Sequence, residues 1–523
     1  MKDFFRSIGP TFFLITGLFT VIGAGLRFEY LDQPFTDEYS WRETSTAMMA
    51  RNFYQGNDNI FFPQLDWGGP GPNYQGREFQ TLTYLTAQLY RIFGPREWVG
   101  RSVVVVFSLW AMFAFFLLLR RVWDPRRAAA ATAVLALMPG AIFTERSFLP
   151  DPVMVSLLLT ALWLLVTFAR RRQLRFLLPA VLIGTLGVLT KLNGLILGLP
   201  AVYLLYAAAR SRPFDRREWA ALAGSAVFVA GCILGYYLWA KHLSETYPPY
   251  HFAGGGKFFS LDKLPYWLDE RYFLPELALI LPWMFGQAAM LLAVVGFILA
   301  LPSRTDEAAA TPQFPYFFHF WAIALVVQYA IEAQHLVDDP YNMHMYFPCV
   351  AAFAGATVVA LTDIAPRPGL RTVVLAAVFG TLLFFGRQGS GYRFAHTESY
   401  HAYAIGRELD TLAEPNELAV VFGGNPLALY YARRRGWTHI PFADYAPGNR
   451  MPDDRTDVAE FRRYWREGAD YVVIPAYDEL LGPLPRTRLE SAYPEIEAFL
   501  FDNFSVIHEG EHGIILRVPE ALR

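Results

Sequence analysis

The sequence predicts a polytopic α-helical membrane protein that ends in a small α/β domain. Of its 523 residues, 54% are hydrophobic and only 18% are charged, and the mean hydropathy is +0.25. That composition is too apolar for an ordinary soluble protein. Several uncharged stretches of about 17–22 residues are long enough to cross a bilayer. From about Gly389 onward charges become frequent and apolar runs shrink to strand length, which indicates a separate domain.

About eleven apolar segments are candidate membrane spans by length and composition. They are residues 11–27, 102–119, 128–143, 153–169, 176–189, 192–209, 219–240, 279–301, 317–331, 347–361 and 372–385. Arginine clusters follow alternate segments, at 120–127, 170–175, 210–217 and 367–371. Because basic residues concentrate in cytoplasmic loops, the remaining loops are expected to face outward. These outer loops are 29–101, 145–151, 241–278, 332–346 and everything after 386.

The first outer loop, about residues 28–101, is expected to contain two juxtamembrane helices. Residues 80–93 are apolar but short, and a crossing there would place every later arginine cluster outside. We therefore predict that this helix lies along the outer membrane surface. In residues 41–54, apolar side chains recur at helical spacing, which leaves Arg42, Glu43 and Arg51 for the wet side.

We divide the chain into a transmembrane domain, residues 1–388, and an extracytoplasmic α/β domain, residues 389–523. Strands are predicted at 418–422, 471–475 and 513–518, and helices at 404–412 and 458–465. The run Gly423-Gly424-Asn425-Pro426 lacks a full phosphate-binding pattern and indicates an ordinary strand-to-helix turn.

Charge and cysteine content exclude two further classes. The net charge of −2 gives no basic patch, so nucleic acid is not an expected partner. The two cysteines, Cys232 and Cys349, both lie in apolar segments, and a disulfide framework is not expected.

The candidate site residues are ionisable groups at the outer ends of the predicted spans. Asp37 and Glu38 follow the first span, Glu78 lies in the same loop, and Asp151 lies in the next outer turn. Ionisable residues near a membrane are functional candidates by default. Each also has an ordinary alternative: Asp37 and Glu38 could cap a helix, Glu78 could be a solvated loop charge, and Asp151 could cap a helix that starts at Pro152.

Two cations complete this candidate set. Lys191 lies in the segment Thr190-Lys191-Leu192-Asn193-Gly194, and His251 lies in a later outer loop. Their ordinary alternatives are a snorkelling lysine at a helix end and an exposed loop histidine. Carboxylates and cations on one membrane face suit two tasks, binding a metal ion or phosphate and deprotonating an acceptor hydroxyl.

Short motifs in a fixed order resemble the C-type membrane glycosyltransferases, in particular bacterial relatives of the protein O-mannosyltransferases and the lipid A aminoarabinose transferase. The matching stretches are Asp37-Glu38-Tyr39, Arg77-Glu78-Phe79, Phe93-Gly94-Pro95-Arg96-Glu97-Trp98-Val99-Gly100-Arg101, Pro150-Asp151-Pro152, Leu189-Thr190-Lys191 and residues 341–348. Two departures stand out. Phe79 occupies the place of the lysine that follows the glutamate in the aminoarabinose branch, and Asn193 intervenes before Gly194.

The resemblance implies an inverting transfer of a hexosyl or pentosyl group. The donor would be a polyprenyl-phosphate sugar, and the acceptor a hydroxyl on a protein, lipid or glycan at the outer face of a bacterial inner membrane. Asp37 is the expected general base, with Glu38 beside it, while Glu78 and Asp151 would orient the acceptor or hold an ion. Lys191, His251 and Arg101 are expected to bind the donor phosphate. A divalent ion (Mg, Mn or Zn) at Asp37 and His251 is a further expectation.

Two other functions fit parts of the same pattern. A transporter or lipid flippase would also carry ionisable residues in its helices, although typically near mid-membrane and in paired repeats. An oligosaccharide ligase with a lipid-linked donor would differ from the main hypothesis only in donor size.

Overall fold

The computed structural model describes residues 9–56, 58–250, 252, 274–301, 314–439, 458–478, 482–483, 486, 489 and 494–520. The chain forms two compact units. The first comprises Met1–Leu31, Arg101–Leu238 and Gly254–Arg393, and the second comprises Asp32–Gly100, Trp239–Ala253 and Phe394–Arg523. The C-terminal residues therefore share a unit with the first outer loop, which the sequence-based division assigns to the transmembrane domain.

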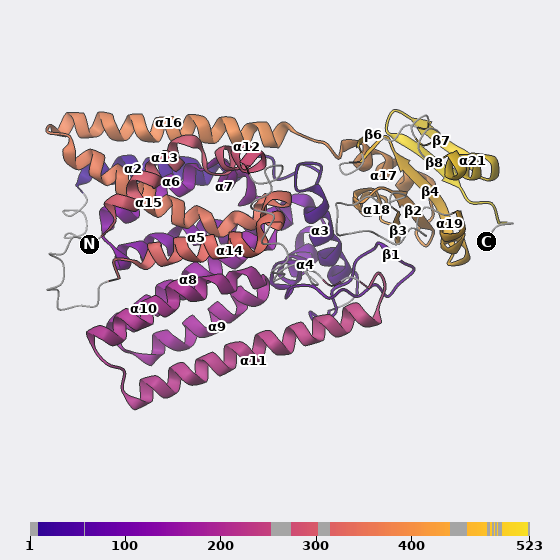
Figure 1. The fold of residues 1–523 in the computed structure, drawn as a ribbon. Helices are drawn as coiled ribbons and strands as arrows, with labels where there is room; N and C mark the ends of the chain where they lie inside the picture. The colour runs from indigo at the N-terminus through magenta and orange to yellow at the C-terminus, as the bar shows by residue number, and fades with distance from the viewer. Residues whose placement is uncertain are drawn as a thin grey trace. The chain divides into compact units, whose positions relative to one another are not determined.

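The first unit is helical (Figure 1). Its elements are α2 (Pro10–Leu26), α5 (Glu97–Val122), α6 (Pro125–Leu137), α7 (Pro139–Thr144), α8 (Pro150–Arg171), α9 (Leu174–Thr190), the 3-10 helix η1 (Leu192–Leu197), α10 (Gly198–Ser211), α11 (Arg216–Thr246), α12 (Leu274–Phe285), α13 (Gln287–Leu299), α14 (Phe317–Asp338), the 3-10 helix η4 (Pro340–Met345), α15 (Tyr346–Ile364) and α16 (Pro368–Ala395).

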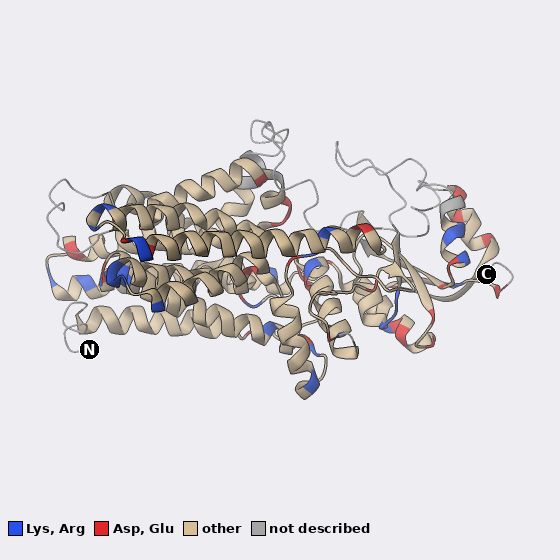
Figure 2. Ribbon diagram, turned by 90° about the horizontal axis from the view of Figure 1, so that it is seen from below, with Lys and Arg blue, Asp and Glu red and all other residues tan. Residues whose placement is uncertain are grey.

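All eleven segments predicted as spans are helical, so their secondary structure is confirmed. In the described part of the chain, six helices are long and apolar enough to cross a membrane. A seventh candidate is the pair α12 and α13, which is bent by 89°, and α2, α9 and part of α14 are shorter apolar helices. Charged residues of these helices lie mostly toward their ends (Figure 2). The number of crossings and their orientation stay predictions.

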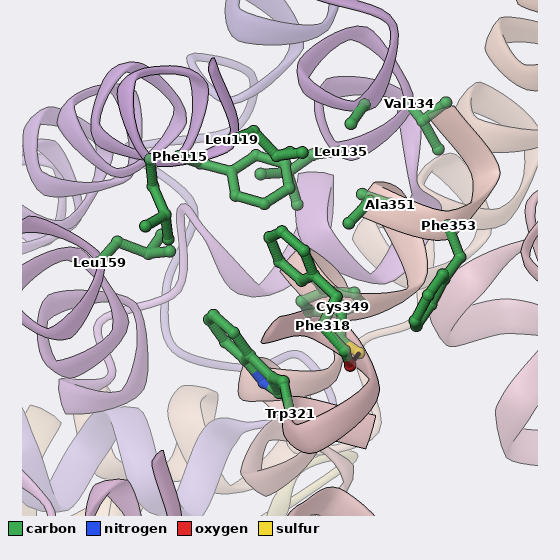
Figure 3. Close-up of a cluster of buried hydrophobic side chains, with 14 of the residues drawn as sticks. Phe115, Leu119, Val134, Leu135, Leu159, Phe318, Trp321, Cys349, Ala351 and Phe353 are labelled. Carbon is green, nitrogen blue, oxygen red and sulfur yellow. Dashed lines mark hydrogen bonds between the residues drawn. The ribbon is translucent and has the colours of Figure 1, made fainter. Parts of the chain in front are cut away.

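The core of the first unit is built where small residues let helices approach closely. An added Cβ at Gly355 of α15 would lie 2.5 Å from the backbone nitrogen of Ala131 in α6, so only glycine fits there. Larger side chains belong to the same core, including the fully buried Trp321, whose indole donates to the carbonyl of Met345 at 3.2 Å. Phe318 stacks on Trp321, and Phe115 and Phe353 each contact Phe318 in the same buried cluster (Figure 3). Close helix packing of small residues is typical of membrane helices.

Several of these helices are interrupted, and the interruptions place polar residues inside the unit. Pro139 separates α6 from α7, because proline lacks the N–H that would continue the helix. Lys191 has an extended backbone conformation (φ −160°, ψ 124°) between α9 and η1. Glu332 breaks the helical geometry inside α14.

The second unit contains helices and a mixed sheet (Figure 1). Its elements are α3 (Ser40–Gln55), β1 (Gly68–Gly69), α4 (Thr81–Phe93), α17 (Tyr400–Leu412), β2 (Leu418–Phe422), α18 (Leu427–Ala432), β3 (Gly436–His439), α19 (Val458–Arg466), β4 (Ala469–Pro475), β5 (Tyr477–Asp478), β6 (Gly482–Pro483), α21 (Pro494–Asn503), β7 (Ser505–Gly510) and β8 (Gly513–Arg517). The strands and helices predicted after residue 400 are confirmed.

The six-stranded sheet has the order β1-β3-β2-β4-β8-β7. Strands β2, β3 and β4 are parallel, while β8 pairs antiparallel with β4 and β7. Strand β1 comes from the first outer loop and pairs antiparallel with β3, Gly68 opposite Trp437. Every residue of β4 is buried, because helices cover both faces of the sheet.

Helices α19 and α21 cover one face of this sheet. Phe461, Trp465 and Leu500 of these helices share a core with Val420 and Val472 of the strands. Helices α17 and α18 contact each other and the sheet from the other side. Two of the strands, β2 and β4, are therefore central strands with no solvent-exposed face.

Candidate functional site

In the first unit, Lys191 and Asp151 form a buried ion pair. Asp151 lies in the first turn of α8, and Lys191 lies at the break between α9 and η1. The Lys191 Nζ donates to Asp151 Oδ1 at 2.6 Å and also to Asn342 Oδ1 of η4. It lies 4.8 Å from the ring centre of Tyr341. The carboxylate is fully buried and the lysine side chain is 11% exposed.

This geometry makes both ordinary alternatives for the pair wrong. Helix α8 begins at Pro150 with Leu149 as its N-cap, so Asp151 is not the capping residue. Lys191 does not extend from a helix end toward water, because its ammonium group is occupied by two side chains of the unit.

A second buried ion pair joins Arg27 to Glu145. The Arg27 Nε donates to Glu145 Oε2 at 2.6 Å, and Nη1 donates to the carbonyls of Gly23 and Ala136 at 2.7 and 2.9 Å. Gly23 permits this approach, since an added Cβ would lie 2.3 Å from the Ala136 oxygen. The other carboxylate oxygen of Glu145 lies 3.6 Å from His344 Nε2. Burial raises the pKa of Glu145, which lies in the loop after α7, while Arg27 opposes the rise.

Two further buried arginines, Arg101 and Arg146, meet at one backbone carbonyl. Arg101 Nη1 donates to the oxygens of Tyr30 and Leu31 at 3.4 and 3.3 Å, and Arg146 Nη1 donates to Tyr30 at 3.2 Å. Tyr30 has φ +56°, a left-handed conformation that is uncommon outside glycine. This turn presents its carbonyl to both guanidinium groups.

We call these residues the basic network; its two ion pairs are connected through η4, which carries both Asn342 and His344. Arg146 follows Glu145 in the sequence, and Glu145 faces Arg27 and His344. Its members are Arg27, Arg101, Glu145, Arg146, Asp151, Lys191, Asn342 and His344. The network gathers the cationic side chains of three arginines and Lys191 with the carboxylates of Glu145 and Asp151. Arginine side chains are suited to binding phosphate, because the guanidinium group can donate two parallel hydrogen bonds to its oxygens.

In the second unit, Asp37 is fully buried just before α3. Its Oδ1 accepts from the backbone N–H of Tyr39 at 3.3 Å, and its own carbonyl accepts from Ser40 at 2.8 Å. The N-cap of α3 is Tyr39, which makes no side-chain capping bond. The capping interpretation of Asp37 and Glu38 therefore does not describe this helix end. The neighbouring Glu38 is half-buried.

Glu78 is the third acid of the second unit, and it pairs with Arg42 of α3. Glu78 is mostly buried, at 12% side-chain exposure, so its interpretation as a solvated loop charge is wrong. The prediction that Arg42, Glu43 and Arg51 face the wet side is also wrong, because all three are buried.

Arg51 shows why those charges are inside. It donates to Asp66 Oδ2 at 2.7 Å and to the Tyr430 carbonyl at 2.6 Å. Buried charges need such partners. Each arginine of α3 is thus neutralised from the first outer loop, Arg42 by Glu78 and Arg51 by Asp66.

The predicted site residues thus divide between the units. Arg101, Asp151 and Lys191 meet in the basic network of the first unit. Asp37, Glu38 and Glu78 lie in the second unit. His251 lies outside the described residues.

Sequence reasoning missed five members of the network: Arg27, Glu145, Arg146, Asn342 and His344. A signal for three of them was present, because Arg27, Glu145 and Arg146 each stand at the end of an apolar segment, at 11–27 and 128–143. Asn342 and His344 lie in a region noted only for its family resemblance.

Among the residues that the structure describes, no group of three or more His, Cys, Asp or Glu side chains could hold a metal ion. The expected pair of Asp37 and His251 includes a residue beyond that description. The described donors therefore do not make up a metal site.

Comparisons with known proteins agree with this architecture. Residues 81–240 match the family described as dolichyl-phosphate-mannose-protein mannosyltransferase. The Bacillus subtilis (strain 168) protein YkcB, provisionally described as a mannosyltransferase, is 26% identical over 212 residues, which are 39% of this chain and 28% of YkcB. The chain thus matches less than a third of that relative's length.

Two solved structures share the fold. The crystal structure of ArnT from Cupriavidus metallidurans bound to undecaprenyl phosphate matches with a TM-score of 0.63 and 15% identity, covering 97% of this chain and 98% of ArnT. The Archaeoglobus fulgidus oligosaccharyltransferase AglB, in complex with an inhibitory peptide and a dolichol-phosphate, matches with a TM-score of 0.56 and 14% identity, over 88% of this chain and 69% of AglB. The chain thus matches this mannosyltransferase family over residues 81–240 and shares the fold of ArnT and AglB.

Proposed function

We propose that the protein transfers a sugar from a polyprenyl-phosphate donor to a hydroxyl acceptor. The observation that carries the proposal is the basic network, in which three arginines and a lysine are buried together among apolar helices of a chain with this fold. Arginine and lysine side chains buried together can donate several hydrogen bonds to an anion. A lipid phosphate supplies that anion, and its apolar tail suits the same surroundings. The lipid phosphates named with ArnT and AglB belong to those proteins and support the choice of donor class.

The proposed reaction is a direct displacement with inversion at the anomeric carbon. The acceptor oxygen attacks that carbon, and the bond from the carbon to the donor phosphate breaks, with its electron pair leaving on the phosphate. Asp37 takes the hydroxyl proton as general base. Lys191 and Arg101, with Arg146, stabilise the charge that develops on the leaving phosphate.

The remaining candidates have supporting roles in this proposal. Asp151 holds the Lys191 ammonium in place through their ion pair. Glu78, held by Arg42, and Glu38 help to orient the acceptor. His251 is assigned to the donor phosphate with Lys191.

The proposal includes a location and a topology. The protein would lie in the bacterial cytoplasmic membrane with about eleven crossings, and the region after residue 389 would be extracytoplasmic. The donor's tail would stay in the bilayer while its sugar phosphate reaches the outer interface.

The test uses purified full-length protein and a short-chain polyprenyl-phosphate sugar. Release of free polyprenyl phosphate together with a glycosylated acceptor is the expected result. Mass spectrometry of lipid-linked sugars and surface glycans in a deletion strain identifies the natural pair. A protein that moves lipid across vesicles but never breaks the bond between sugar and phosphate, with any donor of this class, would show the proposal to be wrong.

A further inference from the structure

The backbone around Asp37 is held by residues that lie almost four hundred positions later in the chain. The N–H of Phe35 donates to the Tyr431 hydroxyl at 3.0 Å. On the next residue, the carbonyl of Thr36 accepts from the N–H of Ser399 at 3.4 Å. All four residues belong to the second unit. The segment 35–41, which we call the Asp37 segment, is thus bound directly by the C-terminal sheet domain.

Asn425 binds the other end of the Asp37 segment. Its Nδ2 donates to Ser40 Oγ at 2.9 Å and to Ser399 Oγ at 3.1 Å. Its Oδ1 accepts from the N–H of Leu427 at 3.1 Å, which fixes the amide orientation. Next to it, the Gly424 carbonyl accepts from the Trp41 indole at 3.0 Å. The turn that the sequence identifies as an ordinary strand-to-helix connection therefore also binds α3.

The residues that make most of these hydrogen bonds are buried and shielded from water. Phe35, Thr36, Asp37 and Ser40 are each at most 1% exposed, and Asn425 is 6% exposed. In buried surroundings a hydrogen bond is electrostatically stronger, and an unmade one is costly. Burial raises the pKa of Tyr431 well above its usual value, so its hydroxyl stays protonated and donates to Glu97 while it accepts from Phe35.

Helix α3 does not hold the segment by itself. Its first turn has no side-chain cap, and Asp37 lies three residues before its first residue. Four hydrogen bonds from the sheet domain flank the carboxylate on both sides. The partner in each of these hydrogen bonds lies within residues 399–431.

We propose that the C-terminal sheet domain is the positioning element for Asp37, and that Asn425 is its central positioning residue. This inference rests on the proposed role of Asp37 as general base. A misplaced base still binds donor but transfers slowly, because displacements of about 1 Å near reacting groups cost on the order of a hundredfold in rate. The domain then has a catalytic purpose that does not require it to contact donor or acceptor.

The experiment compares Asn425→Ala and Tyr431→Phe with Tyr471→Phe in the full-length protein. Tyr471 donates to Glu417 at 2.9 Å at another side of the same sheet, so the control removes a similar hydrogen bond away from the Asp37 segment. We expect kcat to fall about 10- to 100-fold in the first two variants, with the KM for the donor unchanged. Tyr471→Phe should keep the wild-type kcat.

Hydrogen–deuterium exchange of the peptide that contains residues 35–41 provides a readout independent of activity. The exchange should be faster in Asn425→Ala and Tyr431→Phe than in the wild type, and unchanged in Tyr471→Phe. Exchange equal to wild type in both variants would overturn the inference. So would faster exchange with an unchanged kcat, since the segment would then be held for no catalytic purpose.

The two proposals fail differently. A wild-type protein that cleaves no polyprenyl-phosphate sugar removes the proposed function and, with it, the catalytic part of the inference. The exchange measurement still decides in that case whether the sheet domain holds the segment. Normal transfer by all three variants removes the positioning role alone.

Discussion

Lys191 and Asp151 are 40 positions apart in the sequence, and their side chains form an ion pair of 2.6 Å inside the helical unit. Asn342 contributes a third polar partner from η4. The three residues come from separate elements, so the pair connects α8, the break after α9 and the turn before α15. Removing one member leaves a buried charge without its counter-charge, which is more costly than removing both.

The first prediction separates a structural lysine from one that binds the donor. Lys191→Met should lower stability by about 3–5 kcal/mol, because Asp151 is left buried without its cation. The double variant Lys191→Met/Asp151→Leu removes both charges and should return close to wild-type stability. Its transfer rate should stay lowered by about a hundredfold or more, because the cation for the leaving phosphate is missing. Thermal unfolding and phosphate release measure the two effects.

Asp151→Asn is the matched control for this series, since it keeps the Lys191 cation. It should retain more transfer than the double variant. If transfer recovers together with stability in the double variant, Lys191 is structural and the donor-binding assignment is wrong.

The second prediction concerns the ion pair between Arg27 and Glu145. Arg27→Met should cost about 3–5 kcal/mol, because it leaves the Glu145 carboxylate buried and uncompensated. It also removes the donors to the Gly23 and Ala136 carbonyls. Unfolding in detergent, followed by circular dichroism, measures the loss.

A surface ion pair provides the comparison for this variant. Arg126 pairs with Asp363 at 2.6 Å, with side chains 28% and 51% exposed. Arg126→Met should therefore cost less than about 1 kcal/mol. Equal losses of unfolding free energy in the two variants would show that burial does not determine the cost of breaking these ion pairs.

The helices were predictable because long apolar runs leave few alternatives, and strand β4 of the C-terminal domain because it is an apolar run from Tyr471 to Pro475. Burial of α3 was not predictable in the same way. Helical periodicity shows which residues share a face of the helix. It does not show whether other segments of the chain cover the polar face. Arg51 is buried because Asp66 neutralises its charge and the backbone carbonyl of Tyr430, 379 positions away in the sequence, accepts a hydrogen bond from it.

The basic network was only partly predictable for a related reason. Asp151 and Lys191 stand out as charges at span ends, but nothing local indicates that they bind each other. Strand β1 had no detectable pattern at all, since Gly68 and Gly69 have no side chains to alternate. Its pairing with β3 is a tertiary contact between distant segments.

The third prediction tests the topology by cysteine labelling. Cys349 is buried, so Cys232→Ser alone gives a suitable background. Asn416→Cys, on the exposed turn before β2, should react with a membrane-impermeant maleimide in intact cells. Ser211→Cys, in the arginine-rich loop at 210–217, should react only after permeabilisation. The reverse pattern would place the sheet domain in the cytoplasm and remove the proposed outer location.

The last prediction concerns Asp37 itself. Asp37→Asn should lower the transfer rate by about a hundred- to ten-thousandfold, because a carboxamide cannot take up the proton of the acceptor hydroxyl. Stability should change little, since the amide oxygen can still accept from the Tyr39 N–H that Asp37 Oδ1 binds at 3.3 Å.

The matched control is Asp66→Asn, which changes another buried carboxylate of the same unit, the one that pairs with Arg51. That control should lose stability but retain transfer per folded molecule. Measured turnover, normalised to the folded fraction, distinguishes the two carboxylates, and near-normal turnover of Asp37→Asn would assign the general base elsewhere.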